Sequence, residues 1–122
     1  MFAEVILYHN NRCSKSREAL AFLLERDVAL QVVHYLDTPP SVPDLYRLYQ
    51  MLGLASVRGM MRTKDDLYKA LGLADERLDD AALLCAIAEH PQLLERPIAV
   101  VGEKAAIGRP LDNIAALLDM SV

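Results

Sequence analysis

The order of its strand-forming and helix-forming segments limits the fold of this chain more than any other feature of the sequence. Residues 4–8 and 31–35 are short runs rich in β-branched and aromatic residues, which is typical of buried strands. Between them, residues 14–27 carry apolar side chains at helical spacing. A strand–helix–strand unit joins two parallel strands through a right-handed crossover. The first third of the chain therefore predicts one half of an α/β sheet.

The middle of the chain predicts helices only. Ser41 and Asp44 form a capping box with Asp in the place of Glu, which should begin a helix that reaches Leu52 and stops at Gly53. Further helical segments are expected over residues 56–61, 65–71 and 79–89, with N-caps at Thr63 and Asp79 and ends at Gly72 and Pro91.

The last third returns to strand-forming sequence. Residues 97–101 and 105–108 predict two strands joined by a tight turn, hence a hairpin. Pro110 suits the first turn of a final helix that runs to about Leu118.

The total order is β-α-β, a block of helices, and β-β-α. This is the thioredoxin arrangement, here with a helical insert over about residues 41–91 between its two halves. Because 122 residues is the size of one domain and no repeat or linker divides the chain, we expect a single α/β domain over residues 1–122.

Composition excludes several kinds of partner. The chain has 13 Lys and Arg against 17 Asp and Glu and no basic block, so we expect no nucleic acid partner. The apolar helical stretch over residues 81–88 is too short to cross a bilayer, so we expect no membrane partner. The N-terminus lacks the basic region of a signal peptide, which favours a cytoplasmic protein without a structural disulfide.

Cys13 is the candidate nucleophile. It lies where the loop after the first strand meets the first helix, and unpaired N–H groups and the helix dipole favour an anion there. A thiolate in such a place has a lowered pKa. His9, in the same loop, is positioned to orient or polarise the sulfur. The neighbours that we expect to stabilise the thiolate are Ser14, Lys15, Ser16 and Arg17, with Arg12 as a further nearby cation.

Other interpretations of the two cysteines are less consistent with the sequence. Cys13 as a half-buried loop residue without chemistry is disfavoured, because its placement, the cations and the hydroxyls agree. A phosphatase-type Cys-x5-Arg loop is excluded because residue 19 is Ala19. Ser16 stands where a Cys-x-x-Cys motif would have its second thiol, so Cys13 needs an external thiol, of which glutathione is the obvious candidate. Cys85, among leucines of a helix, is expected to be a core residue.

Three arginines are candidate oxyanion ligands by position. Arg62 lies at a helix end, Arg96 directly precedes Pro97, and Arg109 directly precedes Pro110. A guanidinium presents a planar fork of donors that suits an oxyanion and stays charged. Each arginine alone is more often a solvated surface residue, so their grouping is what carries the prediction.

With these residues in view, the chain resembles the glutaredoxin-coupled arsenate reductases. The matching segments are YHNNRCSKSR at 8–17, VRGMMRTK at 57–64, YKALGL at 68–73, HPQLLERPI at 90–98 and GRP at 108–110. The resemblance implies a thioredoxin-like fold, a cis peptide bond before Pro97, and Cys13 as nucleophile influenced by His9. It also implies that the oxyanion is bound by Arg62, Arg96 and Arg109.

The reaction implied by this resemblance is the reduction of arsenate to arsenite. The Cys13 thiolate attacks arsenic, glutathione attacks the adduct, and glutaredoxin resolves the mixed species. Glutathione is then a co-substrate, glutaredoxin and arsenate or a similar oxyanion are partners, and no tightly bound cofactor is needed. The histidines and cysteines have no convincing metal-ligand spacing, so we expect no metal.

Two rival functions remain open. The first is a related thiol-dependent reductase or transferase with another substrate, because the residues predict an anion and do not name arsenic. The second is a non-catalytic regulator of the same fold that binds RNA polymerase. Such regulators typically carry Cys-x-x-Cys as a redox switch, and Ser16 argues against that switch but leaves a binding role open.

Overall fold

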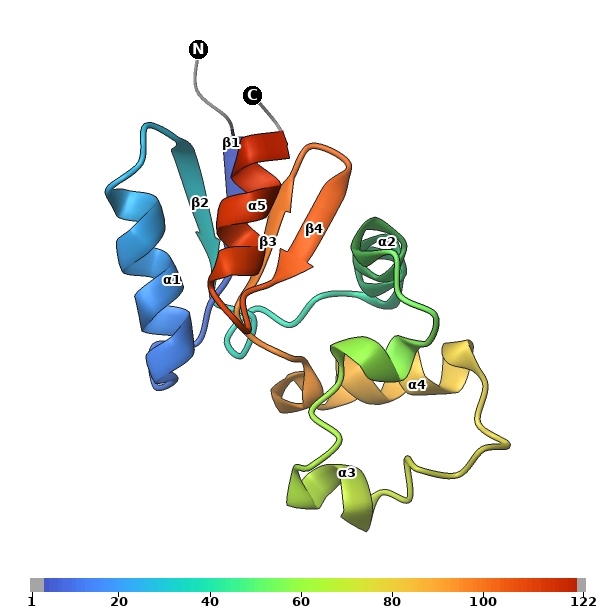
Figure 1. Cartoon of the computed structure of the whole chain (residues 1–122). Coiled ribbons are helices and arrows are strands. Elements are labelled where there is room, and N and C mark those ends of the chain that lie inside the picture. The colour runs from blue at the N-terminus through green and yellow to red at the C-terminus, as the bar shows by residue number, and fades with distance from the viewer. Residues whose placement is uncertain (1–3, 121–122) are drawn as a thin grey trace. The chain divides into compact units, whose positions relative to one another are not determined.

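The computed structural model describes residues 4–120, which divide into two compact units. The first, called the sheet unit, comprises residues 4–38 and 96–120, and the second, called the helical unit, comprises residues 39–95. The predicted order of a β-α-β half, a block of helices and a β-β-α half is confirmed (Figure 1). The prediction that the whole chain is one domain stays a prediction. Within residues 4–120 every helix falls short of the length and apolar character that crossing a membrane requires.

Four strands form the sheet of the sheet unit, in the order β2-β1-β3-β4. The central strand β1 (Glu4–Tyr8) pairs in parallel with β2 (Ala29–Val33) and antiparallel with β3 (Ile98–Val101). The hairpin partner β4 (Lys104–Ile107) pairs antiparallel with β3. The parallel first pair and the C-terminal hairpin were both predicted.

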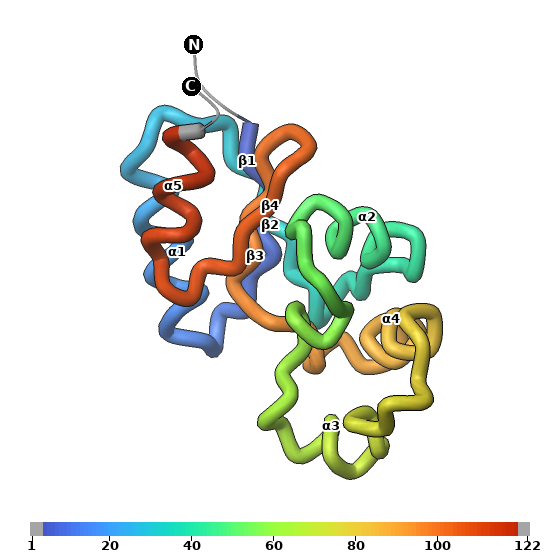
Figure 2. Tube along the Cα trace, turned by 45° about the vertical axis from the view of Figure 1, so that its right-hand side comes forward, coloured from blue at the N-terminus to red at the C-terminus, as the bar shows by residue number. Residues whose placement is uncertain are grey.

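Two helices, α1 (Ser14–Leu24) and α5 (Asp112–Met120), cover one face of this sheet (Figure 2). Because side chains alternate along a strand, Val5 and Leu7 of β1 point to the same face, where they are almost fully buried. The core between sheet and helices also contains Ala19, Leu23, Ala99, Ile114, Leu117 and Leu118. This packing fixes the N-terminus of α1 next to the C-terminal end of β1.

The helical unit consists of short helices that follow one another between β2 and β3. Its α-helices are α2 (Val42–Leu52), α3 (Asp66–Ala70) and α4 (Asp80–Glu89), with 3-10 turns at Val57–Met60 and Pro91–Leu93. The predicted capping of α2 is confirmed: Ser41 Oγ accepts from Asp44 N–H at 3.3 Å, and Gly53 ends the helix at φ +66°. Asp79 caps α4 as predicted, because its side chain accepts from Ala82 N–H at 2.9 Å.

Several predicted boundaries were wrong by a few residues. The second strand is Ala29–Val33 instead of 31–35, because these five residues pair with β1, whereas His34 begins a turn by accepting from the N–H groups of Asp37 and Thr38. The first helix ends at Leu24, three residues early. The last helix begins at Asp112 and not at Pro110, because residues 110–113 form a turn in which Asn113 N–H donates to Pro110 O.

Two predicted side-chain roles in the helical unit were also wrong. The N-cap of α3 is Asp65 and not Thr63, since the Asp65 carboxylate accepts from Leu67 N–H at 2.9 Å. Cys85 was expected in the core, yet it is exposed. Leu83, Leu84 and Ile87 form the buried face of α4, and the turn of about 100° per residue carries Cys85 to the opposite side.

Candidate active site

Cys13 directly precedes α1 and is its N-cap residue. Its backbone is extended, at φ −97° and ψ 123°, and its carbonyl accepts the first helical hydrogen bond from Arg17 N–H at 3.0 Å. The preceding loop is tight because Cys13 N–H donates to Asn10 O and Arg12 N–H donates to Asn10 Oδ1. The Cys13 side chain makes no capping hydrogen bond, but the backbone N–H groups of Lys15 and Ser16 in the first helical turn favour a negative charge on its sulfur.

Two arginines from the C-terminal half of the chain lie at this sulfur. Arg109 Nη2 donates to Cys13 Sγ at 3.3 Å, and Arg109 Nε donates to the carbonyl of Arg96 at 2.7 Å. Arg96 precedes β3 and Arg109 follows β4, so the hairpin brings both to one end of the sheet. The peptide bonds Arg96–Pro97 and Arg109–Pro110 are both cis, and the second of these was not anticipated from the sequence.

The pKa of the Cys13 thiol lies below its ordinary value. Burial is the largest single influence and raises the pKa, since only 8% of the residue is exposed. The Ser16 backbone N–H, the charge of Arg96, the Lys15 backbone N–H and a hydrogen bond from Arg96 lower it, and together they outweigh burial. Because the thiolate is the nucleophilic form, the lowered pKa favours a more reactive sulfur.

His9 lies beneath this loop, with only 1% of its surface exposed. Its Nδ1 is 2.7 Å from Ser16 Oγ, and its Nε2 is 2.6 Å from Asn11 Oδ1. Burial is the main cause that lowers the pKa of His9, and the nearby charges of His34 and Arg17 lower it further against the opposing hydrogen bond to Asn11. The lowered pKa favours the neutral form of this buried imidazole, which is bonded to the loop on one side and to α1 on the other.

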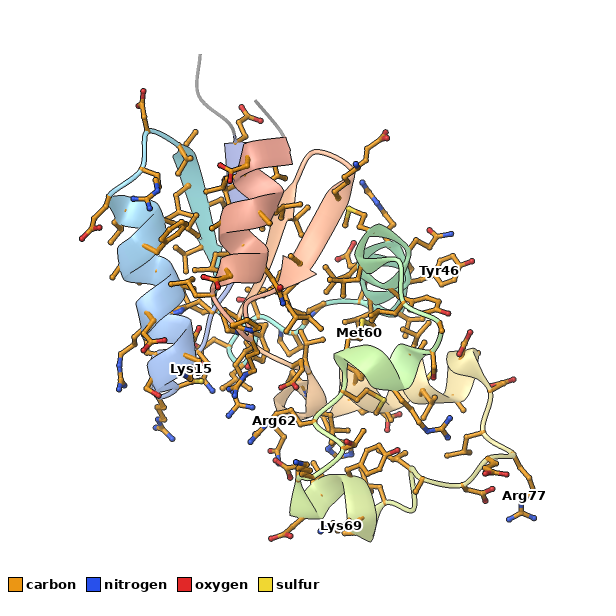
Figure 3. All side chains as sticks on the ribbon, in the orientation of Figure 1. Lys15, Tyr46, Met60, Arg62, Lys69 and Arg77 are labelled. Carbon is orange, nitrogen blue, oxygen red and sulfur yellow. The ribbon has the colours of Figure 1, made fainter. Side chains whose placement is uncertain are left out.

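The other predicted thiolate neighbours differ in how they act. Ser16 is fully buried. Its backbone N–H lowers the pKa of the Cys13 thiol, and its hydroxyl forms a hydrogen bond with His9. Lys15 acts through its backbone N–H, because its side chain projects outward and pairs with Glu18 at 3.8 Å (Figure 3). Arg17 Nη1 donates to Asn11 O at 2.9 Å and so holds the loop. The side chain of Ser14 is exposed.

Arg62 belongs to the helical unit, where it has partners of its own. Its guanidinium pairs with Asp65 at 3.1 Å, and its backbone N–H donates to Leu93 O at 2.7 Å (Figure 3). The structure thus brings Cys13, His9, Arg96 and Arg109 together within the sheet unit. The placement of Arg62 at the same site stays a prediction.

Sequence reasoning missed the two loop asparagines. Asn10 shapes the turn before Cys13, and Asn11 bonds His9. Asparagine in a loop signals a turn, which could have been read from the sequence, but its side-chain partner could not.

A pocket of about 310 Å³ adjoins this loop and is lined by His9, Asn10, Asn11, Arg12, His34, Leu36 and Asp37.

No cluster of three or more His, Cys, Asp or Glu side chains suited to a metal ion occurs within residues 4–120. What the site offers is a thiolate, two guanidinium groups and the backbone N–H groups of a helix N-terminus. Such a set can attack an electrophilic centre while it binds the negative oxygens attached to that centre.

Comparison with known proteins bears on the family. The model of the ArsC family matches residues 8–117. An arsenate reductase of Neisseria meningitidis serogroup A is 61% identical over 94% of this chain and 98% of that protein. The uncharacterized protein YfgD of Escherichia coli K12 is 48% identical over 97% of this chain and 99% of that protein. A solved arsenate reductase from Vibrio cholerae, 52% identical, superposes with a TM-score of 0.94 over 97% of this chain and 100% of that one, which confirms the thioredoxin-like α/β fold.

Proposed function

Because this chain belongs to the ArsC family, we propose that it is an arsenate reductase in which Cys13 is the nucleophile. The observation that carries the proposal is the setting of the Cys13 sulfur, at a helix N-terminus and 3.3 Å from the guanidinium of Arg109, with a lowered pKa. The relatives named arsenate reductase support the choice of substrate, since they match nearly the whole chain.

The first step is attack of the Cys13 thiolate on arsenic(V). A sulfur–arsenic bond forms, and the bond from arsenic to one hydroxyl oxygen breaks as hydroxide leaves. Arg96 and Arg109 bind the negative oxygens and stabilise the charge that builds up in the transition state. Arg62 is the third proposed oxyanion ligand. His9 holds the loop that carries the sulfur.

The electrons come from two thiols, because arsenic(V) must gain two electrons to become arsenic(III). A glutathione thiolate attacks the adduct, arsenite leaves with the electron pair, and a Cys13–glutathione disulfide remains. A glutaredoxin thiol then attacks this disulfide and restores Cys13. Glutathione is needed as a co-substrate because Ser16, and not a second cysteine, stands three residues after Cys13.

The proposed scheme also specifies cofactors, partners and cellular location. No tightly bound cofactor and no metal takes part, and neither a nucleic acid nor a membrane is a partner. A reaction that consumes glutathione belongs in the cytoplasm, where that thiol is kept reduced.

The decisive experiment is arsenate-dependent NADPH oxidation, coupled through glutathione and glutaredoxin. The native protein should be active, Cys13→Ser should be inactive, and Cys85→Ser should match the native rate as the matched thiol control. Activity that survives Cys13→Ser would refute the mechanism.

A second candidate is a glutathione-dependent reductase or transferase that acts on another anion. This second candidate is supported by the 48% identity to a protein whose name assigns no activity. The site residues suit an anion in general and do not select arsenate over other anions. Native protein that lacks arsenate reduction, yet forms a Cys13–glutathione disulfide by exchange with oxidised glutathione, releasing glutathione, and is restored by glutaredoxin, would support this alternative. A protein inactive in both assays would favour the RNA-polymerase-binding regulator.

A further inference from the structure

We propose that Asn11 is a positioning residue that keeps His9 as its neutral Nε2–H tautomer, and that this tautomer holds the Cys13 loop through Ser16. The inference rests on the proposed role of Cys13 as a thiolate. Its test needs no arsenate, so its failure is distinguishable from failure of the proposed activity.

The hydrogen bonds around His9 specify one tautomer. Asn11 Oδ1 is a carbonyl oxygen and only accepts, so the His9 nitrogen 2.6 Å away must carry the proton. In a neutral imidazole the other nitrogen, Nδ1, is then an acceptor. It accepts from the Ser16 hydroxyl, which lies 2.7 Å away. The Ser16 oxygen in turn accepts from Asn10 N–H at 3.0 Å.

The other protonation states of His9 break this chain. If Nδ1 carried a proton, it would donate to Ser16 Oγ, which already accepts from Asn10 N–H. The Ser16 hydroxyl proton would then lose its acceptor at a residue that is 0% exposed. Burying an unsatisfied polar group is unfavourable. His34, whose ring lies edge-on at 5.9 Å, and Arg17 also oppose a charged His9.

The chain of hydrogen bonds ends at the nucleophile. Ser16 bonds His9 and Asn10 through its hydroxyl, and its backbone N–H stabilises the Cys13 thiolate. The loop of residues 9–11 is thereby tied to the first turn of α1, and the N–H groups of that turn stay directed at the sulfur. The Asn11 side chain is linked to Cys13 through His9 and Ser16, which makes Asn11 a positioning and not a catalytic residue.

The test measures the tautomer and the thiol in the same proteins. Long-range proton–nitrogen NMR of 15N-histidine-labelled protein should show native His9 neutral with the proton on Nε2 at pH 7, with His9→Gln used for assignment. In Asn11→Ala this form should lose its dominance. The rate of Cys13 alkylation by iodoacetamide at pH 6 is followed by mass spectrometry of the Cys13 peptide. In Asn11→Ala this rate should fall by roughly threefold to tenfold, because a pKa increase of about half to one unit lowers the thiolate fraction by that factor.

Asn11→Asp supplies the rescue, because an isosteric carboxylate still accepts from Nε2–H. At pH 8 this variant should show the Nε2–H form of His9 and a near-native rate of Cys13 alkylation. The new carboxylate raises the pKa of His9, so the variant should lose the Nε2–H form and the near-native rate when His9 becomes protonated at lower pH. The exposed-amide control Gln50→Ala should change neither readout. Native His9 charged or protonated on Nδ1 would overturn the proposal. So would an Asn11→Ala protein in which only one readout, or neither, changes.

Discussion

At the scale of single residues, the chemistry of this protein depends on how backbone and side-chain donors converge on one sulfur. The Ser16 and Lys15 N–H groups come from the helix that Cys13 begins, while the two arginines come from a hairpin some 80 to 100 residues later. The N–H groups of Lys15 and Ser16 lie near the Cys13 sulfur whenever α1 forms. The two arginines reach the sulfur only when β3 and β4 have paired within the sheet, so the thiolate is fully stabilised only in the folded protein.

Replacing Arg96 by Ala should raise the pKa of the Cys13 thiol, because Arg96 lowers it both through charge and through a hydrogen bond. We expect kcat/KM for arsenate to fall by roughly 10- to 100-fold, the loss of a hydrogen bond to a charged group. The two measurements are a pH titration of Cys13 alkylation and the coupled reductase assay. Arg26→Ala is the matched control, because Arg26 packs over Phe22 at 4.0 Å. Unchanged titration in Arg96→Ala would remove Arg96 from the site.

The lowered thiol pKa also predicts how stability depends on pH. Between the folded pKa of Cys13 and the unfolded value of about 8.5, the unfolded chain binds the additional proton. The free energy of unfolding should therefore gain a contribution as pH rises through this interval, and lose it as pH falls through the folded pKa. Urea unfolding across pH should show this gain in the native protein and not in Cys13→Ser. An identical pH dependence in both proteins would contradict the assigned direction.

At the scale of elements, Gly108 connects the hairpin to the last helix. A Cβ atom at this position would lie 2.6 Å from Ile114 Cδ1 and 2.9 Å from Pro97 Cγ, closer than side-chain atoms pack. Gly108 N–H also donates to Pro97 O at 2.8 Å. The residue directly before Arg109 is thus packed between the start of β3 and the core-facing side of α5.

Gly108→Ala should destabilise the protein by about 1–3 kcal/mol through overpacking. Because the clash lies between the segments that carry Arg96 and Arg109, we also expect weaker arsenate binding, seen as a raised KM. Thermal unfolding and the reductase assay measure the two effects. Gly53→Ala is a useful contrast, since its added Cβ meets nothing within 4 Å and its cost comes only from the backbone at φ +66°. A raised KM in Gly53→Ala as well would show that the effect is not specific to the hairpin.

Within the helical unit, the guanidinium of Arg58 holds the segment after α3. It donates to Tyr68 Oη and to the carbonyls of Leu73 and Asp75 at 2.8–3.2 Å. Arg58→Ala should lower the free energy of unfolding by about 1.5–3 kcal/mol, because two partly buried carbonyls lose a charged donor. Urea unfolding by circular dichroism checks this. Arg77→Ala, whose side chain is 90% exposed and points away from the protein (Figure 3), should change little.

At the scale of the whole molecule, the proposed function draws on both compact units. The nucleophile and two arginines belong to the sheet unit, and Arg62 belongs to the helical unit. Arg62→Ala should raise the KM for arsenate several-fold if it binds an oxyanion oxygen. The exposed Arg47→Ala, also in the helical unit, is the matched control. Equal kinetics in both variants would restrict the oxyanion site to Arg96 and Arg109.

The sequence predicted the order of elements well because hydrophobic spacing and capping residues act locally. Ser41 and Asp79 mark helix starts because their side chains accept from N–H groups three residues ahead, and Gly53 marks a helix end through its left-handed backbone, so all three can be recognised from local sequence. The position of Cys13 at the start of α1 was likewise predictable, because an amphipathic helical segment follows it directly. The exposed Cys85 was missed because burial depends on which face of α4 packs. The His9–Asn11 hydrogen bond was missed because the backbone path of the loop decides it. The bond from Arg109 to the Arg96 carbonyl was missed because it forms only when β3 and β4 pair, although the two arginines were predicted to act together.

The unequal exposure of the two cysteines has a practical consequence. Cys85 is exposed on α4, whereas Cys13 is 8% exposed behind a guanidinium. A bulky maleimide dye should therefore attach to Cys85 long before it reaches the Cys13 sulfur, although the pKa of the Cys13 thiol is lowered. Selective labelling at Cys85 should leave the Cys13 thiol unmodified. The native chain should therefore give a fluorescent or surface-tethered protein that retains its reactive cysteine, without any substitution.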